Sequence, residues 1–502
     1  MIPTLTPELL VIGAVVVPLV GALLLPLFHR TPNLRETVTL ATSAKLAFLV
    51  WSLLPYVLAG ARPEVAVYQV VPGLELAFKV EPLGMLFALV AGSLWIVNSI
   101  YSIGYMRGNN EPRQTSYYVC FAVAISATMG IAFAKNLFTL FVFYEALTLS
   151  TYPLVTHKAT PEAMRAGRVY LGLLLGTSMV LLLPAIVATG MIAGTLDFKP
   201  GGILDGKVSA GLLGLLLALY VFGIGKAALI PFHFWLPAAM VAPTPVSALL
   251  HAVAVVKAGV FTVLKVMVYV FGIDTLAKAG TAEWLLWVSG ATVIIASLVA
   301  LRQDNLKKRL AYSTVSQLSY VVLAAAILTP ISAIGAAMHI AAHAVAKITL
   351  FFAAGSIYTA SHKTEVSELD GIGWKMPWTM TAFAIGALGM IGLPPTAGFL
   401  GKWFMLQGAM QTSQWLPVGV IIASTVLNAS YFLPIVFRAF FVAPLGLRAH
   451  AAGAAPNPHT HADHGEAPLP IVIALSATAL MTVVLFFYPD IPLTLAKMMM
   501  GR

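Results

Sequence analysis

Five ionisable side chains lie inside apolar stretches of this 502-residue chain: Glu145, Lys226, Lys257, Lys347 and Lys402. A charged group near the centre of a lipid bilayer costs at least about 2.5 to 3.5 kcal/mol, so several of them in one chain indicate a path for ions. Burial favours the neutral form of a lysine, and a nearby carboxylate opposes that shift. We therefore expect proton transfer, with Glu145 paired to Lys226 so that displacement of the carboxylate switches the proton affinity of the lysine.

Two histidines extend this set. His339, His343 and Lys347 follow one another at intervals of four residues, which places them in a stripe about 80° wide on one face of a helix. Such a stripe could relay protons through intervening water molecules. In the alternative interpretation the histidines are core residues bonded to neighbouring carbonyl groups. A zinc site is disfavoured because no carboxylate or cysteine nearby completes the ligand set.

Spanning helices must hold these side chains. Hydrophobic residues make up 59% of the chain and charged residues 10%, which is typical of a polytopic membrane protein. With about 20 apolar residues per span, the sequence predicts an all-α fold of about fourteen transmembrane helices. The predicted spans are 9–28, 35–59, 81–104, 116–134, 136–156, 165–194, 209–231, 245–270, 283–301, 305–328, 331–361, 377–411, 414–440 and 469–488.

The seventh and twelfth spans are predicted to be broken. Residues 223–226 (Gly-Ile-Gly-Lys) precede Pro231 and Pro237, and residues 392–395 (Gly-Leu-Pro-Pro) precede Lys402. Proline removes a helix donor, and irregular backbone at this depth is tolerated only where it is buried or lines a polar cavity. Two interrupted spans five helices apart, each with a nearby lysine, indicate inverted repeats of helices 4–8 and 9–13 around a site near the midplane.

The predicted single membrane domain, 1–502, is accordingly divided into five parts. They are the N-terminal helices (1–115), a first repeat (116–270), a second repeat (283–440), a cytoplasmic loop (441–468), and the last helix with its tail (469–502).

Basic residues favour one set of loops. The loops after the odd-numbered spans carry more Lys and Arg residues than the other loops, including Arg30, Arg107, Lys158 and the cluster at 302–309. The positive-inside rule then places these loops in the cytoplasm and both chain ends outside it, in a bacterial inner membrane. The net charge of +10 is thus attributed to topology and not to nucleic-acid binding. Lys45 and Lys265, near span ends, are expected to snorkel to the interface.

No cofactor or metal is expected in this chain. Its single cysteine, Cys120, lies in an apolar helix and supports neither an internal disulfide nor an iron-sulfur site. Three histidines and Asp463 lie within 459–464, in a Pro/Ala-rich loop that is interpreted as a solvated linker, with weak metal binding as the alternative. Any redox chemistry is therefore expected in another subunit.

Three motifs carry a family resemblance. Residues 225–259 contain Lys226, the run Pro-Phe-His-Phe-Trp-Leu-Pro and His251; residues 304–317 read Asp-Asn-Leu-Lys-Lys-Arg-Leu-Ala-Tyr-Ser-Thr-Val-Ser-Gln; residues 398–402 read Gly-Phe-Leu-Gly-Lys. These stretches resemble the proton-translocating antiporter-type subunits of respiratory complex I, Mrp-type cation/proton antiporters and membrane-bound hydrogenases. The resemblance covers roughly residues 80 to 440.

The resemblance implies a row of groups at mid-membrane depth, running from Glu145 and Lys226 through His251 and Lys347 to Lys402. In the family, protons are thought to pass through hydrated half-channels joined by such a row, with the glutamate modulating the first lysine. His339 and His343 flank it. Lys257 resembles a variant of some Mrp-type subunits and is given a secondary place, because a six-residue separation from His251 turns a regular helix by about 240°.

The residues around Glu145 resemble the Mrp-type D-like group most closely, and the chain lacks the long lateral helix of the largest complex I antiporter-like subunit. We therefore expect a non-redox, proton-translocating subunit of a multisubunit Na+/proton (or K+/proton) antiporter, bound to other membrane subunits. Two alternatives stay open. One is a membrane-arm subunit of a complex I-like or hydrogenase oxidoreductase, and the other is the proton-conducting partner of an inorganic-carbon uptake complex.

Overall fold

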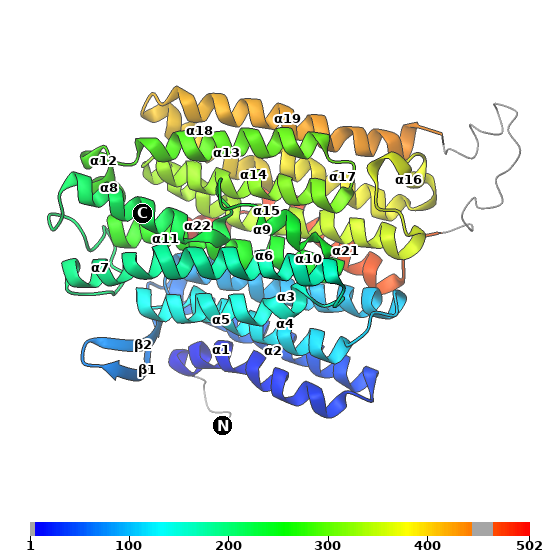
Figure 1. The fold of residues 1–502 in the computed structure, drawn as a ribbon, viewed down its shortest axis with the longest axis horizontal. Coiled ribbons are helices and arrows are strands. Elements are labelled where there is room, and N and C mark those ends of the chain that lie inside the picture. Colours follow the sequence, from blue (N-terminus) through cyan, green and yellow to red (C-terminus); the bar gives the residue numbers. More distant parts are fainter. Residues whose placement is uncertain (1–5, 444–464, 502) are drawn as a thin grey trace, which may run out of the picture.

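The computed structural model describes residues 6–443 and 465–501. Nearly all the long helices run side by side along one direction, as Figure 1 shows, and a two-stranded hairpin lies at one end of the bundle. The first half contains α1 (Pro7–Leu24), η1 (Leu25–Phe28), α2 (Pro32–Leu58), β1 (Glu64–Val71), β2 (Leu74–Lys79), α3 (Pro82–Gly108), α4 (Gln114–Ala132), α5 (Leu137–Val155), α6 (Pro161–Thr177), η2 (Ser178–Leu182), α7 (Leu183–Ala193), α8 (Ala210–Gly223), η3 (Gly225–Ala227), α9 (Trp235–Ala238), η4 (Ala239–Val241), α10 (Thr244–Ala248), η5 (Leu249–Val253), α11 (Val255–Val266), η6 (Met267–Phe271) and α12 (Ile273–Ala279).

The second half continues the bundle. It contains α13 (Glu283–Arg302), α14 (Leu306–Ala326), α15 (Pro330–Ser361), η7 (Val366–Glu368), α16 (Ile372–Lys375), α17 (Pro377–Ile391), α18 (Ala397–Gln411), α19 (Trp415–Phe441), α21 (Leu469–Phe487) and α22 (Asp490–Met499). Many of the helices begin at a side-chain cap that accepts a bond from an orphan backbone N–H. These caps include Thr6, Asn136, Thr160, Ser209, Asn305 and Thr329.

The number of long apolar spans is smaller than the sequence predicts. Among the described residues, ten helices are long and apolar enough to cross a membrane, or eleven if one pair bent by 75° is a single span. The predicted count of fourteen is not confirmed. The difference arises at α8, which is only 14 residues long, at α14, which begins with three basic residues in its first turn, and at the divided pair α17 and α18.

Both predicted breaks are present. Helix α8 ends at Gly223 and the short η3 follows at once, while α17 ends at Ile391 and α18 begins six residues later at Ala397. Gly392 terminates α17 with a φ of 84°, a left-handed conformation that glycine adopts without steric cost. The pieces on either side of each break stay within the bundle.

Helix α15 forms the centre of the molecule. Its apolar window is completely buried, and it packs against α3, α10, α11, α14, α17, α18, α21 and α22. A reciprocal cap between Thr329 and Ser332 starts the helix, Pro330 occupies its first turn, and His362 ends it in a left-handed conformation. The histidines and lysine of the predicted stripe are therefore all enclosed by other helices.

Loop contacts show that the spans alternate in direction. At the hairpin end, backbone bonds join Lys79 to Phe133, Leu137 to Leu196 and Lys199 to Tyr269. At the opposite end, bonds join Val366 to Asp304, Asn109 to Thr359 and Lys307 to Ala242. The basic loops after the odd-numbered spans thus share one face of the bundle, as the sequence predicts. The hairpin, which pairs Glu64 with Lys79 and Val71 with Leu74, lies where only a loop is expected.

Candidate functional site

The break after α8 places Lys226 against α5. Its side chain is fully buried, and Nζ donates to the Tyr144 carbonyl at 2.9 Å and to Thr148 Oγ1 at 2.6 Å. The ammonium also lies 3.2 Å from the centroid of the Tyr144 ring. Gly259 of α11 packs directly on this turn, because a Cβ there would collide with the Lys226 carbonyl carbon. Lys226 is thus held by neutral oxygens and an aromatic face.

Glu145 does not form the expected contact with Lys226. In the described part of the chain, neither carboxylate oxygen of Glu145 has a hydrogen-bond partner, and no ion pair joins it to Lys226. Tyr144 and Thr148 are four residues apart and share the face that meets Lys226, whereas Glu145 is turned about 100° from Tyr144 and about 60° from Thr148. Its side chain is nevertheless only 8% exposed.

Lys257 occupies a more central place than the sequence indicates. It is 0% exposed on α11, and its Nζ is in hydrogen-bond contact with Nδ1 of His343 on α15. The predicted orientation assumed a regular helix, but π-helical η5 and a distorted Ala254 (φ −116°, ψ −71°) intervene. The backbone of His251 lies in η5, and its side chain is outside what the structure describes.

From His343 a series of contacts leads to the second break. The rings of His343 and His339 stack with centroids 6.0 Å apart, and His339 Nε2 lies 3.0 Å from Gln317 Oε1. Gln317 Nε2 donates to the Met390 carbonyl at 3.3 Å, which also accepts from Lys402 Nζ at 3.2 Å. These contacts connect α11, α15, α14 and α17 to α18 through the buried interior.

Lys347 joins the same carbonyl by a second route. Its Nζ donates to Ser313 Oγ at 2.9 Å, and Ser313 Oγ accepts from the Tyr431 hydroxyl at 3.1 Å. Tyr431 in turn contacts Asn428 Oδ1, and Asn428 Nδ2 lies 3.4 Å from the Met390 carbonyl oxygen. The structure therefore brings Lys257, His343, His339, Lys347 and Lys402 into one network.

The break in α17 makes this junction possible. At the end of a helix the last carbonyl groups lack intrahelical partners, and here the Met390 and Ile391 carbonyls accept from Lys402 Nζ. Gly392 gives this lysine its room, since a Cβ there would lie 2.8 Å from Lys402 Cδ. Thr425 and the Tyr320 ring complete the surroundings of the ammonium.

Sequence reasoning missed the neutral members of the network. Gln317, Ser313, Asn428 and Tyr431 are fully buried polar residues in apolar helices, and Gln317 and Ser313 belong to one of the family-like motifs. Their polarity within apolar helices could have identified them, because each buried polar group needs a hydrogen-bond partner in a low-dielectric interior. Which partner each one meets depends on the rotation of the helices.

The prediction that Lys265 snorkels to the interface is wrong. This lysine is fully buried on α11, where its Nζ donates to the Ala134 carbonyl at 2.8 Å and pairs with Glu81 Oε2 at 3.4 Å. Lys45, by contrast, is exposed on α2 beside the Phe48 ring. The sequence could not separate them because Glu81, the partner of Lys265, precedes α3 and is distant along the chain.

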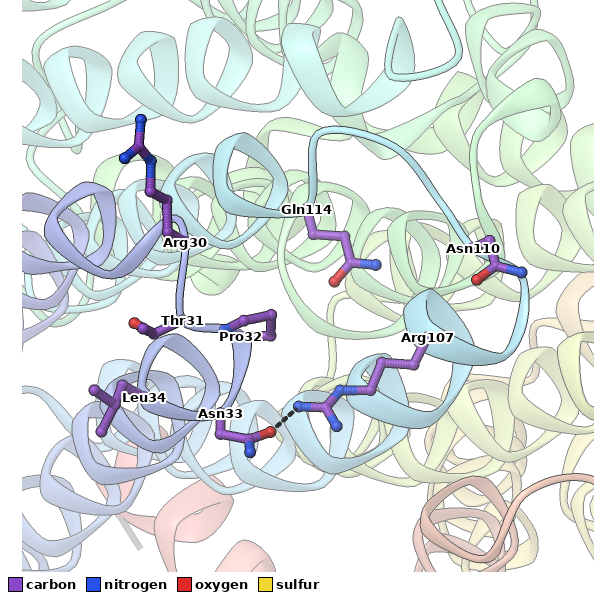
Figure 2. A pocket seen from close by; sticks show the side chains of 8 residues that line it. All are labelled: Arg30, Thr31, Pro32, Asn33, Leu34, Arg107, Asn110 and Gln114. Carbon is purple, nitrogen blue, oxygen red and sulfur yellow. Dashed lines mark hydrogen bonds between the residues drawn. The ribbon is translucent and has the colours of Figure 1, made fainter.

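A surface hollow of about 770 Å³ lies apart from this network, on the basic face. Figure 2 shows its lining from α2, the end of α3 and the start of α4, with Arg107 bonded to Asn33. Among the described residues, no three His, Cys, Asp or Glu side chains gather as metal ligands. The histidines and Asp463 of 459–464 lie outside the described residues.

Comparison with known proteins agrees with this geometry. Residues 134–428, more than half of the chain, match the family described as "NADH:quinone oxidoreductase/Mrp antiporter, TM". The chain belongs to this family. The matched region includes Glu145, Lys226, Lys257, the α15 stripe and Lys402.

Relatives of this NADH:quinone oxidoreductase/Mrp antiporter family member differ in the complexes their names describe. NADH-quinone oxidoreductase subunit N of Desulforudis audaxviator is 33% identical over 377 residues, 73% of each chain. Hydrogenase-4 component B of Escherichia coli is 29% identical over 431 residues, which are 80% of this chain but only 63% of that protein. The solved structure of the Mrp complex from Dietzia sp. has a chain with a TM-score of 0.85 and 21% identity, covering 99% of this chain and 97% of the other. That likeness establishes the fold as a multi-pass membrane bundle.

Proposed function

We propose that this chain is a proton-translocating subunit of a multisubunit complex in a bacterial inner membrane, with its basic face in the cytoplasm. One observation carries the proposal: buried Lys257, His343, His339 and Lys402 are linked across five helices by side-chain contacts and one freed carbonyl. Such groups are costly in a bilayer, and where they occur they commonly mark ion or proton pathways. Membership of the family supports the same function.

Lys226 and Glu145 form the other part of the proposed path. In the described residues, no hydrogen bond or ion pair joins Lys226 to Lys257, so the two parts exchange protons only through water or side-chain movement. Glu145 acts on Lys226 through space, because both are buried and Glu145 directly follows Tyr144, whose carbonyl accepts from Lys226 Nζ. Lys402 is the terminal exchange group at the far side.

Two host complexes remain candidates, and each has a supporting observation. The residues around Glu145, which resemble the Mrp-type D-like group, favour a monovalent cation/proton antiporter. The Desulforudis relative, named as a component of NADH-quinone oxidoreductase, favours a redox-driven membrane arm. In the first, a cation gradient drives the protons; in the second, electron transfer in other subunits does.

The test uses everted membrane vesicles from cells that produce the chain together with the products of its neighbouring genes. A pH-sensitive dye reports proton movement when Na+, K+, NADH or H2 is added. Lys226→Ala should abolish the response to the driving substrate while the complex still assembles, whereas Lys45→Ala on the exposed face of α2 should leave it intact. A full response from assembled Lys226→Ala complex would refute the mechanism.

A further inference from the structure

A second hollow on the basic face has no place in the proton path. It measures about 760 Å³ and lies between the starts of α6 and α14 and the end of α15; we refer to it as the α6–α14 hollow. Five of its lining residues are basic and one, Glu162, is acidic. The basic residues are Lys158, Arg165, Lys307, Lys308 and Lys363.

None of these five basic side chains forms an ion pair within the described residues, although Lys307 already donates to the Ala242 carbonyl. Burial lowers the pKa of Lys363, although Glu368 opposes the effect. The hollow in Figure 2 is different: its Arg107 donates to both Glu36 and Asn33. The α6–α14 hollow therefore presents basic side chains that no acidic partner within the described residues has paired.

Two helix starts add to that charge. Thr160 caps α6 and Asn305 caps α14, and both residues line the hollow. The start of a helix carries a partial positive charge and favours anions, phosphate groups among them. Each cap satisfies only one of the unpaired backbone N–H groups, so each helix start still adds a positive electrostatic potential to that of the side-chain cations.

Part of the lining of the hollow is apolar. Val169, Met240 and Leu306 belong to its lining. The outer surface of the α6–η2 span presents Met164 and Val180, 41% and 68% exposed, in a span expected to contact lipid. A ligand there would meet cations at the level of the headgroups and hydrocarbon below them. Free phosphate has no hydrocarbon part that could contact the apolar side chains of the lining.

We propose that the α6–α14 hollow binds the phosphate-bearing headgroup of an anionic phospholipid. Basic pockets between spanning helices on the cytoplasmic side are suited to such headgroups. The ligand would also touch the machinery of the first repeat, because Lys307 Nζ donates at 2.5 Å to the Ala242 carbonyl, in the segment that runs from Lys226 to η5.

The experiment measures binding, so its result is independent of the proton-transfer proposal. The intact complex is purified, stripped of lipid by detergent exchange, and titrated with phosphatidylglycerol, phosphatidylcholine or inorganic phosphate; bound lipid is counted by native mass spectrometry. The test variant is Lys158→Gln/Lys308→Gln/Lys363→Gln. The matched control, Lys79→Gln/Lys199→Gln/Lys278→Gln, removes the same charge from the hairpin end.

The unaltered complex and the control should retain phosphatidylglycerol, and the test variant should bind it about a hundredfold more weakly. Binding to the unaltered complex should also weaken as salt is raised. Equal lipid binding in both triple variants would overturn the proposal. Inorganic phosphate that binds as tightly as the lipid would also overturn it. So would a cross-link between Lys308 and a carboxyl group of another subunit, which would show that a protein and not a lipid occupies the hollow. Thermal unfolding of each variant checks that the complex is folded.

Discussion

Lys257 and His343, from helices α11 and α15, share a buried hydrogen-bond contact through Nζ and Nδ1. Both groups are basic, so the contact is favourable only when one of them supplies a lone pair and the other the proton. The pair therefore holds a single proton between two residues of different helices. This contact supports our including Lys257 in the proposed transfer path.

Replacing Lys257 with methionine should separate function from stability. We expect Lys257→Met to slow proton translocation about a hundredfold, since an acid–base group is lost, while the melting temperature of the complex stays level or rises because a buried ammonium is removed. Lys45→Met is the control for an exposed lysine. Translocation in vesicles and thermal unfolding of purified complex measure the two effects; normal translocation by Lys257→Met would exclude this lysine from the path.

Gln317 should be needed for the connection between the two breaks. Gln317→Leu leaves His339 Nε2 and the Met390 carbonyl without this partner, and a buried polar group left unsatisfied costs about 1 to 3 kcal/mol. We expect lower thermal stability together with slower translocation. Ser319→Ala, which removes only a bond to the carbonyl of its own helix at Val315, should change neither. A stable and fully active Gln317→Leu complex would contradict the proposed role.

The Glu81 and Lys265 pair should show strong coupling. Their side chains are only 5% and 1% exposed, and removal of one partner from a buried ion pair costs about 3 to 5 kcal/mol because the other charge is left uncompensated. Glu81→Leu should therefore destabilise the complex more than Glu81→Leu/Lys265→Leu. Denaturant unfolding of the two single variants and the double variant completes the cycle. Additive effects would show that the two residues act separately.

His157 should make the protein sensitive to mild acid. Burial first, and Arg113 second, lower the pKa of this loop histidine, while a bond to the Pro112 carbonyl opposes them. A histidine whose folded pKa lies below its unfolded value of about 6.5 stabilises the protein above that pH, and this stabilisation is lost as the pH falls towards the folded pKa. We expect His157→Phe, which keeps a ring beside Tyr117, to lose less thermal stability than the unaltered protein between about pH 7.5 and pH 5. Parallel unfolding curves for the two proteins would contradict this.

The buried charges and the two breaks could be predicted because their physical cost is visible in the sequence. Lysine within an apolar run and Pro/Gly pairs in a span each demand a special environment, and the structure encloses Lys226, Lys347 and Lys402 beside or near such breaks. The division of loops into two faces follows from alternation of the spans in the same direct way. Charge content indicates how deep a segment lies in the membrane, and proline content indicates whether its helix is continuous. Both are properties of a single segment.

Partners could not be predicted, because they depend on how helices are rotated against each other. On α5, Tyr144 and Thr148 bond to Lys226, whereas the carboxylate of Glu145, the next residue after Tyr144, does not. A π-helical turn before α11 invalidates the orientation that regular geometry assigns to Lys257. The roles of Gln317 and Asn428 likewise arise only when α14 and α19 close around the end of α17.

The junction at residue 390 is made by a main-chain oxygen. Any amino acid at this position supplies the same main-chain acceptor to Gln317, Lys402 and Asn428, whereas the Met390 side chain itself only packs in the core. Mutagenesis of position 390 would therefore not reveal this acceptor, because no amino-acid substitution removes the main-chain carbonyl group. Only chemical replacement of the amide that contains this carbonyl, or a shift of the helix end, would remove the acceptor from the network.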